Sequence, residues 1–164
     1  MSTENPYDKF LDGRPVEEVL AETGDKIAEY LEVIGRENAR REPAPGKWSA
    51  AEIVCHLADC ELVFGFRLRQ TLAEDEPTIQ PFDQDKWAWE EQYSNIPPAL
   101  ALETFSVLRK WNLQLIKTVL PTAAKRKMTH PERGTMTFQT VVKTMAGHDL
   151  NHLEQLHRIA GKPE

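Results

Sequence analysis

Apolar residues recur at steps of three and four along four long segments of this 164-residue chain, which is the spacing of amphipathic helices. Polar and proline-containing stretches separate the segments. We therefore expect an all-α protein, a single-domain four-helix bundle over residues 1–164, with a long connection between the second and third helices. The four helices are expected over residues 15–34, 49–73, 98–120 and 137–160.

Residues at the ends of these segments carry the usual helix signals. Ser49 and Glu52 have the spacing of a capping box, and Thr137 can cap the last helix. Gly35 is suited to end the first helix. Because proline disfavours a helical residue before it, we expect the third helix to end before Pro121.

Two connecting segments are informative. Residues 74–97 contain three prolines together with aromatic side chains, which favours an ordered crossover with short helical pieces over disorder. We expect this crossover to cover or border a functional pocket; the alternative is that its aromatic residues pack across the bundle or at a dimer interface. Residues 131–134 predict a turn, at the tip of a small hairpin between residues 128 and 136. The aromatic residues in question are Phe82, Trp87, Trp89 and Tyr93.

Composition excludes several classes of function. The net charge of −6 argues against nucleic-acid binding, which needs a basic face. There is no apolar run of membrane-spanning length and no secretory signal pattern, so we expect no membrane partner. Cys55 and Cys60 lie on one helix with side chains in different directions and cannot pair, which favours a reducing, cytoplasmic setting.

Three histidines are the main chemical signal. His148 and His152 are four residues apart on the last helix, so both imidazoles project from one face. His56 lies in the apolar stripe of the second helix, where its ring nitrogens must find partners. A single histidine of this kind is more often a hydrogen-bonded core residue than a ligand, but three together favour a shared metal ion. We therefore predict a metal site of His56, His148 and His152.

Such a site would be open. Three imidazoles leave positions for water or substrate, as in catalytic rather than structural sites. Cys60, one turn after His56, is either a soft fourth ligand or a small buried hydrophobe. The zinc-protease motif is absent, because Asp149 stands where that motif has glutamate and Arg158 where its extended form has histidine.

Other polar residues have weaker assignments. Asp59, Asn151 and Gln155 could orient a ligand imidazole through a hydrogen bond to the ring nitrogen that does not bind the metal. Glu61 fits a solvated helix face better. His130 is either a pocket-wall residue or part of a structural hydrogen bond. His157 falls off the inward stripe and is expected at the surface.

These motifs, in this order, resemble the DinB-like superfamily, and within it the branch of metal-dependent hydrolases and bacillithiol S-transferases. The resemblance implies a four-helix bundle, a divalent metal held by His56, His148 and His152, and often a homodimer. The mycothiol-dependent branch typically has glutamate in place of His148, so mycothiol is disfavoured. The resemblance is carried by residues 46–49, 56–59, 77–83, 87, 130–132, 148 and 152.

The expected function follows from the open site and the resemblance. The first hypothesis is a metal-dependent S-transferase, with zinc or nickel, that activates a low-molecular-weight, bacillithiol-type thiol for attack on an electrophilic small molecule. The second is a metal-dependent hydrolase that uses metal-bound hydroxide on a small-molecule substrate. The third is a non-catalytic metal-binding stress-response module. The catalytic residues and the substrate are not identified by the sequence.

Overall fold

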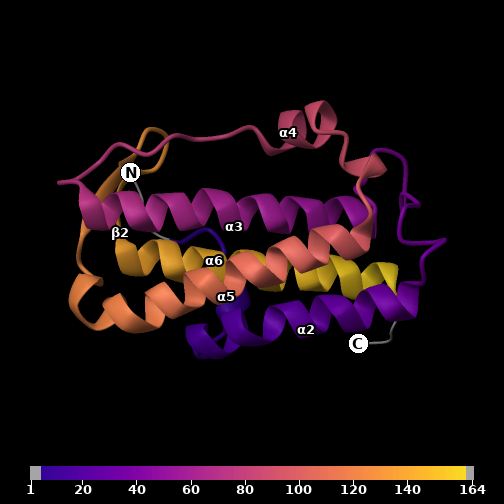
Figure 1. Cartoon of the computed structure of the whole chain (residues 1–164), viewed down its shortest axis with the longest axis horizontal. Coiled ribbons are helices and arrows are strands. Elements are labelled where there is room, and N and C mark those ends of the chain that lie inside the picture. Colours follow the sequence, from indigo (N-terminus) through magenta and orange to yellow (C-terminus); the bar gives the residue numbers. More distant parts are fainter. Residues whose placement is uncertain (1–4, 162–164) are drawn as a thin grey trace.

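Four long helices, α2, α3, α5 and α6, pack against one another in the computed structural model, which describes residues 5–161 (Figure 1). The expected all-α four-helix bundle is confirmed. None of the helices in this range combines the length and apolar character needed to cross a membrane. In chain order the elements are α1 (Asp8–Leu11), α2 (Val16–Ile34), α3 (Ala50–Ala73), α4 (Gln84–Glu90), the 3-10 helix η1 (Tyr93–Asn95), α5 (Pro98–Ala123), β1 (Lys127–His130), β2 (Gly134–Thr137) and α6 (Phe138–Ile159).

The predicted capping residues set the helix boundaries. Ser49 accepts from the Glu52 backbone N–H, and the Glu52 carboxylate accepts from the Ser49 N–H at 2.8 Å, so the capping box is present. The Thr137 hydroxyl accepts from the Thr140 N–H at 3.1 Å and caps α6. Gly35, with φ of 77°, follows the last residue of α2. Local side-chain chemistry therefore fixes where the site-bearing helices α3 and α6 begin.

The predicted end of the third helix is wrong, because α5 continues through Pro121 to Ala123. Proline removes one backbone donor, but here it does so only in the last turn. Ala123 is buried, and the Ala124 carbonyl accepts from the Gln139 N–H at 3.1 Å. Tertiary contacts with the start of α6 therefore outweigh the local preference of proline.

The short helix α1 is not indicated by the sequence pattern, since four residues are too few to show a helical period. It packs against α6. A Cβ atom on Gly147 of α6 would lie 2.6 Å from the Tyr7 carbonyl oxygen, so only glycine admits this approach of the chain. The segment before the bundle is thereby brought onto the helix that carries two of the histidines.

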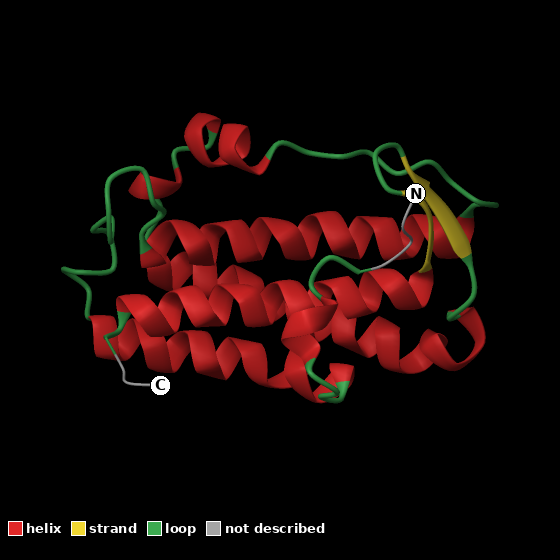
Figure 2. Ribbon diagram, turned by 180° about the vertical axis from the view of Figure 1, so that it is seen from behind, coloured by secondary structure: helices red, strands yellow, loops and turns green. Residues whose placement is uncertain are grey.

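The crossover between α3 and α5 runs along the outer side of α3 and contains α4 and η1, as predicted (Figures 1 and 2). The predicted hairpin is also confirmed: Met128 pairs with Met136 in antiparallel register. The two segments are joined, because the Ile79 N–H donates to the Thr129 carbonyl and the Thr129 N–H to the Pro77 carbonyl, each at 2.9 Å. The hairpin thus anchors the start of the crossover at one end of the bundle.

A buried ion-pair network joins all four long helices. Arg109 of α5 donates to Glu61 of α3 and to Asp149 of α6, each at 2.7 Å, and to the Leu20 carbonyl of α2 at 2.9 Å. Thr23 of α2 donates to Asp149 at 3.0 Å. The expectation that Glu61 lies on a solvated face is wrong, because its side chain is 2% exposed and paired. A charge on a helix is buried here because its partner is supplied by another helix.

We predict that Arg109→Met destabilises the protein by about 3–5 kcal/mol, because it leaves two carboxylates buried without their cation. The matched control is Arg158→Met: Arg158 pairs with Glu154 at the surface at 3.7 Å, and its loss should cost less than about 1 kcal/mol. Urea unfolding of both variants measures the free energies. Equal losses in the two variants would contradict the structural role given to Arg109.

Candidate metal centre

Helices α3 and α6 bring three histidines together. The Nε2 atom of His148 lies 3.1 Å from Nε2 of His56 and 3.1 Å from Nε2 of His152. The three residues are 5%, 1% and 6% exposed, respectively. The residues predicted as metal ligands are therefore neighbours, with His148 between the other two.

The hydrogen bonds of the rings show where their lone pairs point. The Gln155 Oε1 atom accepts from His152 Nδ1 at 2.8 Å, so the neutral His152 ring presents an unprotonated Nε2 toward His148. His148 Nε2 can donate one proton along one line, yet two nitrogens face it. A cation beside His148 Nε2 would satisfy the lone pairs that face it; the other donor next to His56 is the Cys60 thiol, 3.5 Å from its Nε2. The donor set therefore fits a divalent metal.

Burial keeps the three imidazoles uncharged. It lowers the pKa of His56 to about 3, helped by the neighbouring His152, and it lowers the pKa of His152 to about 4. Burial, with the proximity of His152 and His56 and the positive charge of Arg109, also holds the pKa of His148 well below its usual range. Neutral imidazole is the form that binds metals, so no proton need leave these rings near neutral pH.

Aromatic rings enclose the histidines. The ring centroids of Trp48 and His56 are 4.9 Å apart, and those of Tyr7 and His148 are 5.3 Å apart. The Phe64 ring lies 6.1 Å from that of His148. Sequence reasoning missed Tyr7, which stands outside every periodic segment; Gly147, where Tyr7 meets α6, is the only local sign of its approach. These rings contribute to the burial of His56 and His148.

A cavity of about 600 Å³ opens beside His152. Its walls include Trp48 and Asn151, together with the charged side chains of Lys47 and Arg158. Cavities of about 300–1,000 Å³ are typical of small-molecule sites. One member of the cluster, His152, therefore borders a space that can hold a ligand.

The crossover reaches this cavity, but not through the residues expected. The first two residues of α4 line it, whereas none of the four aromatic residues does so within the described chain. Trp89 is 81% exposed, and Tyr93 is buried against α3, where its hydroxyl donates to Asp59. Phe82 and Trp87 line a separate groove. Of the four aromatic residues, Tyr93 packs on α3, Phe82 and Trp87 pack on each other, and Trp89 faces solvent.

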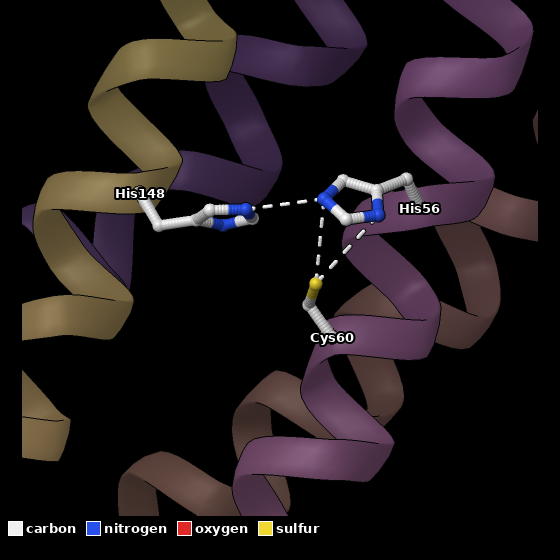
Figure 3. A group of neighbouring side chains, drawn as sticks. All are labelled: His56, Cys60 and His148. Carbon is white, nitrogen blue, oxygen red and sulfur yellow. Dashed lines mark hydrogen bonds between the residues drawn. The ribbon is translucent and has the colours of Figure 1, made fainter. Parts of the chain in front are cut away.

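Cys60 is the other potential ligand in the cluster. Its Sγ lies 3.5 Å from His56 Nε2, and the donor atoms of Cys60, His56 and His148 all lie within 4.8 Å of one another (Figure 3). The side chain is buried, with 4% exposure. The sulfur therefore lies beside His56 and is shielded from solvent.

The remaining candidates lie elsewhere. His130 is buried at the hairpin turn, where Nδ1 accepts from the Glu132 backbone N–H at 3.2 Å, so it takes part in a structural hydrogen bond. His157 is half-buried rather than fully exposed, and its Nδ1 lies 3.4 Å from the Tyr30 hydroxyl. Neither belongs to the histidine cluster.

We predict that the metal-free protein loses stability as the pH falls from about 6.5 toward 4. The unfolded chain protonates its histidines near pH 6.5, whereas burial keeps His56, His148 and His152 neutral in the folded state to lower pH. The loss should reach about 2 kcal/mol per histidine near pH 5, at about 1.4 kcal/mol per pH unit. Urea unfolding at pH 6.5 and at pH 5, in the presence of a chelator, measures this loss of stability. Replacing all three by glutamine should flatten the profile, and an equally steep profile in that variant would refute the assignment.

Comparison with known proteins agrees with this architecture. The sequence profile described as the DinB superfamily matches residues 20–156. A protein of Oceanobacillus iheyensis with the provisional name of metal-dependent hydrolase is 30% identical over 119 residues, covering 73% of this chain and 69% of that protein. YfiT of Bacillus subtilis, which has the same provisional name, is 23% identical over 144 residues, covering 87% of this chain and 81% of YfiT.

A solved structure shows the same fold. YfiT, described as a probable metal-dependent hydrolase with an unusual four-helix bundle topology, superimposes with a TM-score of 0.79 at 24% identity, over 90% of this chain and 87% of YfiT. The resemblance inferred from the sequence motifs is thus confirmed. Since the family profile spans most of the chain, the protein belongs to the DinB superfamily.

Proposed function

We propose that His56, His148 and His152 hold one divalent metal ion, zinc or nickel, and that the protein is a metal-dependent S-transferase. It attaches a low-molecular-weight, bacillithiol-type thiol to an electrophilic small molecule. The observation that supports this proposal is the convergence of three neutral imidazoles beside a cavity of about 600 Å³. The homodimer implied by the family resemblance stays a prediction.

Each residue has a distinct part in this proposal. A divalent ion on neutral ligands keeps its full charge and lowers the pKa of a bound thiol or water. Gln155 holds the His152 ring through Nδ1, so that Nε2 stays available. Tyr7 packs against the His148 ring and Trp48 against the His56 ring. Both keep water away from these rings, which strengthens electrostatic interactions at the site.

The cavity supports a polar, anionic ligand. Lys47 and Arg158 contribute positive charge to its walls, while Asp85 of α4 contributes negative charge. Trp48 offers an apolar surface next to His56. A thiol cosubstrate that carries carboxylate groups would meet the two cations, with its sulfur directed toward His152.

A metal-dependent hydrolase is the second candidate, favoured by the provisional names of the relatives. The same cluster and cavity would serve it, with water in place of the thiol as the activated nucleophile. The two candidates differ in one requirement, because only the transferase consumes a thiol.

We predict that His56→Ala, His148→Ala and His152→Ala each lower metal affinity by about 100-fold or more, since even loss of an outer partner of a ligand costs about 10–100-fold. Helical content should be retained, because the apolar stripes of four helices supply the fold. His157→Ala is the matched control: it lies on α6 outside the cluster and should bind metal normally. Metal content and far-ultraviolet circular dichroism are measured on the same samples. Full occupancy in any of the first three variants would remove that residue from the site.

We predict that the metal-loaded protein conjugates bacillithiol to a model electrophile faster than the uncatalysed reaction, and that a chelator abolishes the excess rate. Product formation is measured with and without the thiol, using an ester as the alternative substrate. Metal-dependent ester hydrolysis without thiol would favour the hydrolase. If the metal is bound but neither reaction is accelerated, a non-catalytic metal-binding module is favoured and the transferase proposal is overturned.

A further inference from the structure

A second hollow of the surface lies between α3 and the crossover. It has a volume of about 530 Å³, within the range of small-molecule sites. We call it the crossover groove; it is lined by Leu62, Val63, Phe66 and Arg67 of α3 and by residues 80–83 and Trp87 of the crossover. Within residues 5–161, none lines both this groove and the cavity beside His152. The groove is therefore a separate space with mainly apolar walls.

Arg67 distinguishes this groove from an ordinary apolar hollow. The residue is only 9% exposed, and in the part of the chain that the structure describes no carboxylate forms an ion pair with it. Arg109, the other buried arginine of the bundle, is paired with two carboxylates. Burial lowers the pKa of Arg67, which reflects the cost of keeping its charge away from water. A bound anion would supply the missing counter-charge.

The donors of the Arg67 guanidinium are largely unused. Nη2 donates to the Gln80 carbonyl at 2.6 Å, and this is the one acceptor that the described residues offer the group. A guanidinium carries five N–H donors in a planar fork. Its central carbon lies 5.9 Å from the ring centroid of Phe64 and 6.0 Å from that of Phe82, so aromatic rings accompany the charge. The remaining donors suit the two oxygens of a carboxylate.

The Asp83 carboxylate also lines the groove, but it serves another contact. Its Oδ1 accepts from the Lys86 backbone N–H at 3.0 Å and caps α4. Asp83 therefore leaves the charge of Arg67 uncompensated. A ligand with a second negative charge would be repelled by this carboxylate, so the groove favours a monoanion.

We propose that the crossover groove binds a small monocarboxylate with an aromatic body. Its carboxylate pairs with Arg67, and its ring lies against the aromatic side chains of the groove, which include Phe66, Phe82 and Trp87. The charge of Arg67 selects the carboxylate, and the apolar walls select the body. This site does not depend on the metal proposed for the histidines.

The first test uses the full-length wild-type protein and two probes that differ in charge, 3-phenylpropionate and its neutral amide. Isothermal titration calorimetry should show that the carboxylate binds about tenfold or more tightly than the amide, because a hydrogen bond to a charged group contributes more than a neutral one. The affinity should be the same with and without a chelator. No saturable binding, equal affinities for the two probes, or binding that a chelator abolishes would each overturn the proposal.

Arg67→Met locates the carboxylate, and Arg69→Met is its matched control. Arg69 lies on the same helix with its guanidinium 5.9 Å from the Trp111 ring, but it does not line the groove. Affinity for 3-phenylpropionate should fall about tenfold or more in Arg67→Met and stay at the wild-type value in Arg69→Met. Unchanged affinity in folded Arg67→Met, or an equal loss in both folded variants, would overturn the proposal. If Arg67→Met does not fold, the two probes on the wild type decide.

A second copy of the chain is the alternative occupant, because Phe66 at the groove is 66% exposed. Analytical ultracentrifugation of the wild type and of Phe66→Asp tests it. We expect the two proteins to have the same oligomeric state. A wild-type dimer that separates in Phe66→Asp would show that another copy covers the groove, and it would overturn the small-molecule site.

Discussion

The pairing of Arg109 with two buried carboxylates is the constraint on which the geometry of the site depends. Glu61 directly follows Cys60 on α3, and Asp149 directly follows His148 on α6. Both carboxylates are held by one guanidinium at 2.7 Å. A shift of α3 against α6 by one residue would leave a buried charge without its partner, at a cost of several kcal/mol. The ion pairs therefore set the register that brings the two ligand-bearing helices together.

The close packing of α3 on α5 also helps to fix the position of Glu61. A Cβ atom at Gly65 would lie 2.6 Å from Asn112 Oδ1, so glycine permits the contact. The Asn112 amide donates to both the backbone carbonyl and the carboxylate of Glu61, at 2.9 and 3.0 Å, and Arg69 donates back to Asn112 at 2.7 Å. Glu61 is thus held by α5 through two residues, Asn112 and Arg109. Its position is defined by polar contacts as well as by apolar packing.

Features encoded in neighbouring residues could be predicted from the sequence. The Ser49 cap, the hairpin and the inward-facing histidines depend on periods and short spacings, which are visible without the fold. Glu61 could not be assigned, because a charged residue on a helix usually faces water and its partner Arg109 is 48 positions away. The end of the third helix before Pro121 was predicted wrongly for a related reason, because the contacts that keep this helix intact come from the start of α6.

The residues of the candidate site also fall into two groups, those that the sequence could indicate and those that it could not. The three histidines lie on two periodic helices, so their common face could be predicted, and Gln155 was among the residues expected to orient them. Tyr7 and the first residues of α4 reach the site from segments outside the four long helices, whose paths depend on contacts distant in sequence. Aromatic content indicated that the crossover is ordered, but not which of its residues face the cavity.

The buried charges of Glu61, Asp149 and Arg109 also affect the electrostatic potential next to the candidate site. Glu61 and Asp149 carry two negative charges against the one positive charge of Arg109, which leaves one net negative charge beside Cys60 and His148. Neutral imidazoles alone do not compensate a dication in a buried setting, where unbalanced charge is costly. The two carboxylates act on Cys60, where they add to the effect of burial in raising the pKa of the thiol. At His148 the charge of Arg109 acts in the opposite direction and helps to lower the pKa of the ring. The network that aligns α3 with α6 therefore places its negative potential at the cysteine and its positive charge toward His148.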